Sequence, residues 1–191
     1  AVSKTIEAID VLKANGVVMV GHSAGAEIAV HVAARLPSPV RGLVLAAPVL
    51  GGGPPGFVRA LTAAPLIRRV GPPILRLGVR VGLPIALKQA WADPSRVTRE
   101  VIDGFRAPLL KPGATEALWS MTASTNPMTP DWVALGSTPA LVIKGDRDKW
   151  VTAVPLPQVE TITYDRCGHL PHEECAQRFV NDVLAFVGRL G

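Results

Sequence analysis

The chain has 191 residues, of which 48% are hydrophobic and 18% are charged, and its formal net charge is +5. This composition excludes an intrinsically disordered chain, and the lack of an uninterrupted apolar run of about 18 residues predicts no membrane-spanning segment. The two cysteines, Cys167 and Cys175, are too few for a disulfide framework and predict free thiols in a reducing, cytoplasmic compartment.

The positive charge is concentrated in one segment. Residues 51–88 carry six basic side chains and no acidic one, so the rest of the chain is close to neutral. The segment lacks the aromatic interleaving and the motifs of nucleic-acid-binding surfaces, which predicts that nucleic acid is not a partner. No Cys or His spacing indicates a zinc site or another metal site.

Apolar periodicity predicts alternating helices and strands on both sides of this basic segment. Helical spacing of apolar residues is present in 2–15, 24–35 and 173–190. Short apolar runs typical of buried strands occupy 17–20, 41–48, 140–145 and 160–165. This alternation predicts an α/β fold with a parallel sheet and helices on both of its faces.

Residues from Gly51 to Ser137 interrupt the alternation. The segment opens with GGGPPG and continues with helical, Pro- and Arg-rich sequence that contains no clear strand. Its prolines are expected to break any long helix. We therefore expect a core region at 1–50, a helical cap inserted at 51–137 and a second core region at 138–191.

The sequence Gly21-His22-Ser23-Ala24-Gly25 stands between a predicted strand and a predicted helix. On such a turn a serine hydroxyl projects from the strand end, at the positive end of the helix. The flanking glycines are expected to remove Cβ atoms where the backbone is crowded. Ser23 is a candidate nucleophile and the Ala24 N–H a candidate oxyanion donor, and the alternative is an ordinary glycine-rich turn with a capping serine.

Two later strands are also followed by polar groups. Asp146 and Asp148 lie in LVIKGDRD, and either carboxylate could orient an imidazole or be a solvated loop residue. His169 lies in CGHLPHEE, just after the strand predicted at 160–165. Because the carboxyl ends of parallel strands meet at one edge of a sheet, a serine, an acid and a histidine can come together there.

The three motifs GHSAG, LVIKGDRD and GHLPHEE together resemble the α/β-hydrolase superfamily, in particular its serine-nucleophile esterases and lipases with a helical cap. The resemblance implies a triad of Ser23, Asp148 and His169, an acyl-enzyme, and no metal or cofactor. It also implies upstream strands and a His-Gly oxyanion loop. No such loop precedes Gly21, so we expect a partial fold, truncated at its N-terminus.

The predicted reaction is hydrolysis of carboxylic esters or related acyl bonds in small hydrophobic substrates. His22, Trp119 and Met121 are candidate substrate-binding residues, although Trp and Met pack in protein cores more often. Residues 57–87 could cover the site with solvated arginines, line an acyl pocket, bind an anionic substrate, or meet an anionic membrane surface. A carbon–carbon bond hydrolase, a haloperoxidase-like enzyme and a non-catalytic binding protein stay open on the same fold.

Overall fold

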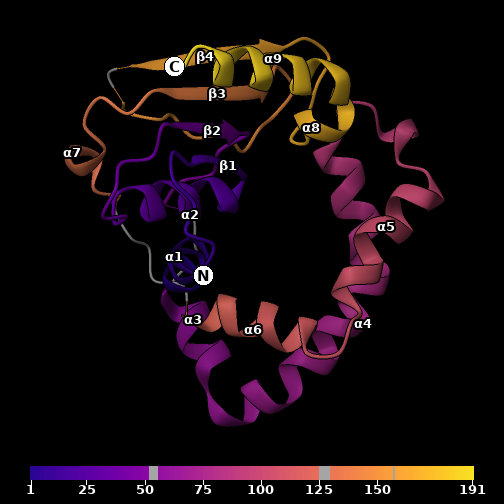
Figure 1. Cartoon of the computed structure of the whole chain (residues 1–191). Coiled ribbons are helices and arrows are strands. Elements are labelled where there is room, and N and C mark those ends of the chain that lie inside the picture. The colour runs from indigo at the N-terminus through magenta and orange to yellow at the C-terminus, as the bar shows by residue number, and fades with distance from the viewer. Residues whose placement is uncertain (52–55, 125–129, 157) are drawn as a thin grey trace. The chain divides into compact units, whose positions relative to one another are not determined.

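The computed structural model describes residues 1–51, 56–124, 130–156 and 158–191 (Figure 1). The chain folds into two compact units, Ala1–Gly51 with Thr129–Gly191, and Gly52–Met128. Residues 52–55 of the GGGPPG sequence lie outside the described residues.

The first unit is built on a parallel four-stranded sheet with the strand order β1-β2-β3-β4. Its strands are β1 (Val18–His22), β2 (Gly42–Ala46), β3 (Ala140–Gly145) and β4 (Val159–Tyr164). Every residue of β2 is buried, and so is every residue of β3 except Lys144, as expected for central strands covered on both faces. The predicted α/β fold with a parallel sheet is confirmed.

Alternate side chains of β2 enter two separate cores. Leu43 and Leu45 pack on one face of the sheet with α2 (Ala24–Ala33). Val44, which lies between them, packs on the other face with α9 (Ala176–Gly188). Because successive residues of a strand point to opposite faces, one apolar strand joins both helical layers, which lie on opposite sides of the sheet in Figure 1.

The predicted helices of this unit are present with changed boundaries. The other helices of the unit are α1 (Val2–Val11), α7 (Trp132–Leu135) and α8 (Pro171–Glu174). α1 is shorter than predicted, because Lys13 and Gly16 have φ angles of 48° and 64°, which a right-handed helix does not allow. The helix predicted at 173–190 is divided, since Cys175, with φ −131° and ψ 41°, separates α8 from α9.

The second unit is helical in its described residues. Its elements are α3 (Gly56–Ala63), α4 (Pro65–Ala90), a short 3-10 turn η1 (Pro94–Arg96), α5 (Arg99–Leu109) and α6 (Ala114–Ser124). The prediction that proline breaks any long helix here is wrong, because α4 runs for 26 residues through Pro72, Pro73 and Pro84. Pro84 cannot donate to the carbonyl of Arg80, and that carbonyl instead accepts a hydrogen bond from the guanidinium of Arg106 at 3.4 Å.

α4 has a further property that the search for an uninterrupted apolar run missed. By length and composition alone it could cross a membrane, and it is the one helix among the described residues that could. Arg76 and Arg80 interrupt its apolar stretch, of which 22% is buried in the structure. The sequence-based exclusion of a membrane-spanning helix therefore does not hold for α4 on this criterion.

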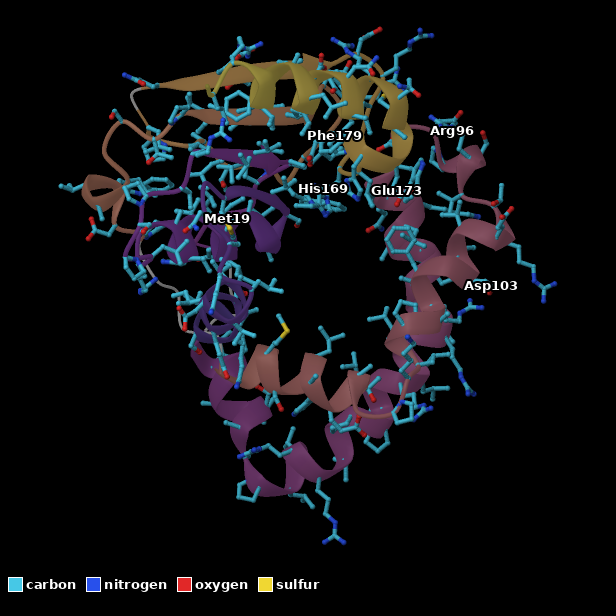
Figure 2. All side chains as sticks on the ribbon, in the orientation of Figure 1. Met19, Arg96, Asp103, His169, Glu173 and Phe179 are labelled. Atoms are coloured by element: carbon cyan, nitrogen blue, oxygen red, sulfur yellow. The ribbon has the colours of Figure 1, made fainter. Side chains whose placement is uncertain are left out.

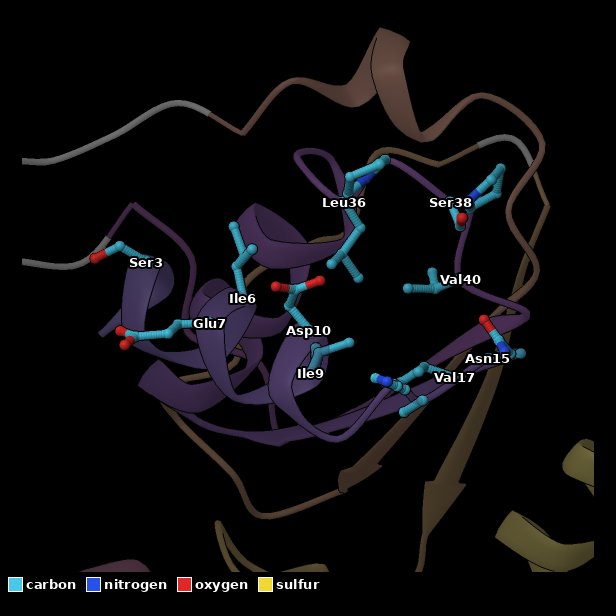
Figure 3. A pocket seen from close by; sticks show the side chains of 15 residues that line it. Ser3, Ile6, Glu7, Ile9, Asp10, Asn15, Val17, Leu36, Ser38 and Val40 are labelled. Atoms are coloured by element: carbon cyan, nitrogen blue, oxygen red, sulfur yellow. The ribbon is translucent and has the colours of Figure 1, made fainter.

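A cavity of about 580 Å³ lies in the first unit, between α1 and the segment that leads into β2 (Figure 3). Its apolar wall includes Ile6, Ile9 and Leu36. Val17 and Val40, which also line it, lie just before the first paired residues of β1 and β2, Val18 and Gly42. The cavity therefore lies at the amino ends of the strands, whereas the candidate catalytic residues follow their carboxyl ends.

Candidate active site

Ser23 occupies a sharp turn between β1 and α2. Its backbone angles, φ 53° and ψ −123°, belong to a region that residues with a side chain rarely adopt. Its N–H donates a hydrogen bond of 2.9 Å to the carbonyl of Ala46 in β2, which fixes the turn to the end of the neighbouring strand. The strained turn therefore presents the hydroxyl at the edge of the sheet where the strands end.

The two glycines that flank this turn differ in how closely other atoms surround them. A Cβ on Gly21 would lie 2.5 Å from the carbonyl oxygen of Gly25, so the expected crowding is confirmed at Gly21. At Gly25 the same expectation is wrong, because a Cβ there would meet no described atom within 4 Å. The close approach of β1 to the first turn of α2 thus requires a glycine on the strand side only.

Ala24 is the first residue of α2 and is exposed. The N–H groups in the first turn of a helix have no acceptor within that helix, and the helix dipole is positive at this end. The Ala24 N–H is therefore suitably placed in the chain to donate to an oxygen that becomes negative beside Ser23.

His169, labelled in Figure 2, lies between β4 and α8. It joins Ser23 to an acid. Its Nε2 lies 2.9 Å from Ser23 Oγ, and its Nδ1 lies 2.8 Å from Asp148 Oδ2. The other Asp148 oxygen accepts the Trp150 N–H at 2.9 Å, and the Asp148 side chain is fully buried. Because a carboxylate only accepts, Nδ1 carries the hydrogen, and Nε2 is left to accept the proton of Ser23.

Asp146, the competing acid, has a different partner. Its Oδ1 accepts the backbone N–H of Cys167 at 3.1 Å, and this hydrogen bond lowers the pKa of Asp146. Gly145 makes the approach possible, because a Cβ there would collide with the carbonyl of Cys167. The structure thus places Asp148 against His169, while Asp146 ties the loop after β3 to the loop after β4.

The backbone of the His169 loop is held from both sides. Glu174 Oε1 accepts the N–H of Gly168 at 2.9 Å and the N–H of Leu170 at 3.3 Å. His22 Nε2 lies 2.8 Å from the His169 carbonyl, to which it donates. Glu174 is only 6% exposed, so its carboxylate is committed to this loop.

Sequence reasoning missed the role of Glu174, because a Glu in the first turn of a helix usually faces solvent. In the structure the His22 ring contacts the loop that carries His169, and the substrate-binding role expected for His22 stays a prediction. Burial lowers the pKa of His22. Trp150, also missed, sets its ring edge-on to His169 at 4.9 Å between centroids, and its position directly after the acid loop was the available signal.

His172 belongs to a group of neighbouring rings that are tilted relative to one another. Its ring centroid lies 4.5 Å from that of His22. Burial lowers the pKa of His172 to about 4, and the proximity of His22 and His169 acts in the same direction. A neutral His172 therefore adds no positive charge beside the hydrogen-bonded series.

Trp119 and Met121 belong to α6 of the second unit. The Trp119 indole N–H donates to the Thr62 carbonyl at 3.2 Å, and its ring packs against Gly71 of α4. Met121 is 49% exposed. Trp119 thus has a packing role within its own unit, and the contribution of both residues to substrate binding stays a prediction.

Among the described residues, no three or more His, Cys, Asp or Glu side chains lie close enough together to hold a metal ion. Both cysteines are free, and burial raises the pKa of the Cys167 thiol. Neither observation adds a group to the serine, histidine and aspartate already described.

A parallel sheet that presents a serine on a strained strand-to-helix turn, with a histidine and an acid on neighbouring loops, defines a recognised class. The model of the alpha/beta hydrolase family matches residues 1–183, and the chain belongs to this family. The chain is 27% identical to the dihydrolipoyllysine-residue acetyltransferase component of an acetoin cleaving system from Pseudomonas putida. That match covers 95% of this chain and 47% of the relative, so the chain spans about half the length of the curated protein.

Two solved structures illustrate the shared fold. A meta-cleavage product hydrolase from Pseudomonas fluorescens IP01 matches with a TM-score of 0.74 and 20% identity, over 100% of this chain and 71% of that one. The epoxide hydrolase CorEH matches with a TM-score of 0.69 and 19% identity, over 100% of this chain and 74% of that one. At such identities the likeness shows the architecture, and the chemistry has to be argued from the site itself.

Proposed function

We propose that this chain carries the catalytic residues of a serine hydrolase that cleaves carboxylic esters or related acyl bonds. One observation carries the proposal: Ser23 Oγ, the two ring nitrogens of His169 and Asp148 form a continuous series with contacts of 2.9 and 2.8 Å. These distances suit a general base that takes the proton of a serine nucleophile and an acid that orients this base.

In the proposed reaction His169 Nε2 removes the hydroxyl proton while Ser23 Oγ attacks the substrate carbonyl carbon. The resulting oxyanion accepts a hydrogen bond from the Ala24 N–H, and the Asp148 carboxylate stabilises the imidazolium. Collapse of the tetrahedral intermediate breaks the bond to the leaving alcohol, which takes the proton from His169. Water, deprotonated by His169, then attacks the acyl group and releases the acid and free Ser23.

The acyl group is proposed to be small and hydrophobic, and the chemistry uses no cofactor. Water is one acceptor for the acyl group of the acyl-enzyme. The alternative is that another nucleophile accepts the acyl group, so that the enzyme catalyses acyl transfer. The Pseudomonas putida relative favours keeping this alternative, because its name is that of an acetyltransferase component. Adding a thiol acceptor to the assay separates the two, since transfer yields a thioester and hydrolysis yields the free acid.

The test uses the intact protein with p-nitrophenyl esters of increasing acyl length. We expect turnover by the wild type and a loss of at least about 10³-fold in Ser23→Ala, because the variant cannot form the acyl-enzyme. A vinylogous ketone substrate is assayed in parallel. Turnover of the ketone without turnover of any ester would favour carbon–carbon bond hydrolysis, and no turnover of either would favour a binding protein.

A further inference from the structure

One side of α4 carries large apolar side chains that the other described helices of its own unit leave exposed. These side chains are 41–71% exposed and recur every three or four residues: Leu66, Val70, Ile74, Leu77, Val81 and Ile85. At 3.6 residues per turn they form one face of the helix, and at 1.5 Å per residue they extend for about 28 Å. We refer to these six residues as the apolar stripe.

α4 packs within its own unit through a different face. Among its buried residues, Pro72 and Val79 lie opposite the apolar stripe in helical register, whereas Gly71 lies beside it, about 90° from its centre. Gly71 lies against the ring of Trp119 in α6, so α6 packs on α4 beside the apolar stripe and not on it. The apolar stripe is therefore an additional apolar surface, and its length is far greater than a pocket for a small acyl group needs.

The charge of α4 complements this surface. Arg69, Arg76 and Arg80 are exposed and follow one border of the apolar stripe, and α4 contains no acidic residue. Within the described residues none of the three forms an ion pair, and Arg76 donates to the carbonyl of Leu110 instead. An apolar face bordered by arginines without counter-charges matches the boundary between lipid acyl chains and anionic headgroups.

We propose that α4 binds the surface of an anionic membrane, with the apolar stripe among the acyl chains and the three arginines at the phosphates. The helix lies in the plane of the interface and does not cross the bilayer, because its opposite face, with Pro72 and Val79, is buried and Arg76 and Arg80 lie midway along its length. This proposal does not depend on the proposed hydrolase activity.

The test is flotation of the intact protein with vesicles of phosphatidylcholine alone and of phosphatidylcholine mixed with phosphatidylglycerol. We expect the wild type to prefer the anionic vesicles. Leu77→Asp with Val81→Asp should reduce binding to anionic vesicles by at least about tenfold, because two charges would enter the acyl region. The matched control is Val133→Asp on α7, which also replaces an exposed valine (90%) and should bind like the wild type.

A second variant tests the charges and preserves the apolar packing. Arg69→Gln with Arg80→Gln should remove most of the preference for anionic vesicles, since each basic residue near such a surface is worth about fivefold in binding. If circular dichroism shows that the Leu77→Asp, Val81→Asp variant is unfolded, the arginine variant alone tests the proposal. The proposal is overturned if the wild type binds both kinds of vesicle equally, or if either variant binds as the wild type does. It is also overturned if the wild type binds no vesicles and instead forms a dimer that the acidic variant cannot form.

Discussion

Glu174→Ala is the most informative perturbation of the loop that carries His169. In the wild type one carboxylate oxygen accepts two buried backbone N–H groups, those of Gly168 and Leu170, on either side of the histidine. The alanine variant leaves both N–H groups without this acceptor. A buried donor that loses its partner costs roughly 1–3 kcal/mol, so two donors, one of them in a long bond of 3.3 Å, give about 3 kcal/mol of lost stability.

The same change should slow the chemistry. Without the carboxylate to hold its two N–H groups, the loop can relax, and a displacement of about 1 Å between His169 and Ser23 costs on the order of 10²-fold in rate. Two assays on the intact protein test this: urea unfolding followed by circular dichroism, and the second-order rate of labelling of Ser23 by a fluorophosphonate. The two assays separate a loss of stability from a loss of alignment, since labelling is measured where the variant is still folded.

Glu173→Ala is the matched control, because Glu173 is the neighbouring carboxylate of α8 and is exposed. It should change the free energy of unfolding by less than about 0.5 kcal/mol and leave the labelling rate near that of the wild type. The role assigned to Glu174 is contradicted if Glu174→Ala unfolds at the same urea concentration as Glu173→Ala, or if both variants are labelled equally fast.

Three further predictions concern the acids, the glycines and the histidines around the same site. Asp148→Asn should lower kcat by about 10⁴-fold and Asp146→Asn by less than about tenfold, since only Asp148 contacts His169; equal losses in steady-state assays would contradict the assignment. Gly21→Ala should lower the free energy of unfolding by about 2 kcal/mol, whereas Gly25→Ala should leave it unchanged or raise it by up to about 1 kcal/mol. Urea titrations that rank these two variants in the opposite order would show that the turn is packed differently. The pKa of His172 is about 4 in the folded chain and 6.5 as its ordinary value, so the unfolded state binds the proton first as the pH falls. The free energy of unfolding should therefore decrease from about pH 6.5 toward pH 4. Over this range His172→Gln should lose about 1–2 kcal/mol less of its free energy of unfolding than the wild type, a value reduced because His172 is partly exposed. Parallel pH dependence of the two proteins in thermal or urea unfolding would contradict this.

The parts of the fold that depend on local pattern could be predicted from the sequence. A strand buried on both faces needs an apolar run, and β3 (Ala140–Gly145) has the predicted boundaries for this reason. The Ser23 turn has a glycine where backbone atoms meet, which is a property of a few adjacent residues. The order of serine, acid and histidine behind successive strands then brings them to one edge of the sheet.

The interactions that the sequence did not reveal join residues far apart in the chain or depend on a single rotamer. Asp146 and Asp148 lie in one loop with the same composition around them, so only the three-dimensional structure distinguishes the partner of Cys167 from the partner of His169. Glu174 turns inward because a divided helix, α8 and α9, aims its carboxylate at the His169 loop. The Arg80 carbonyl, which Pro84 leaves without its usual donor, accepts from Arg106, a residue on another helix.

The most direct test of the account is the position of a fluorophosphonate adduct on the intact protein, determined by mass spectrometry of its peptides. We predict one adduct, on Ser23, that is absent from Ser23→Ala and forms at least about 10³-fold more slowly in His169→Ala, because the imidazole activates the hydroxyl. An adduct on another residue, or labelling of Ser23 at an unchanged rate without His169, would contradict the proposed triad.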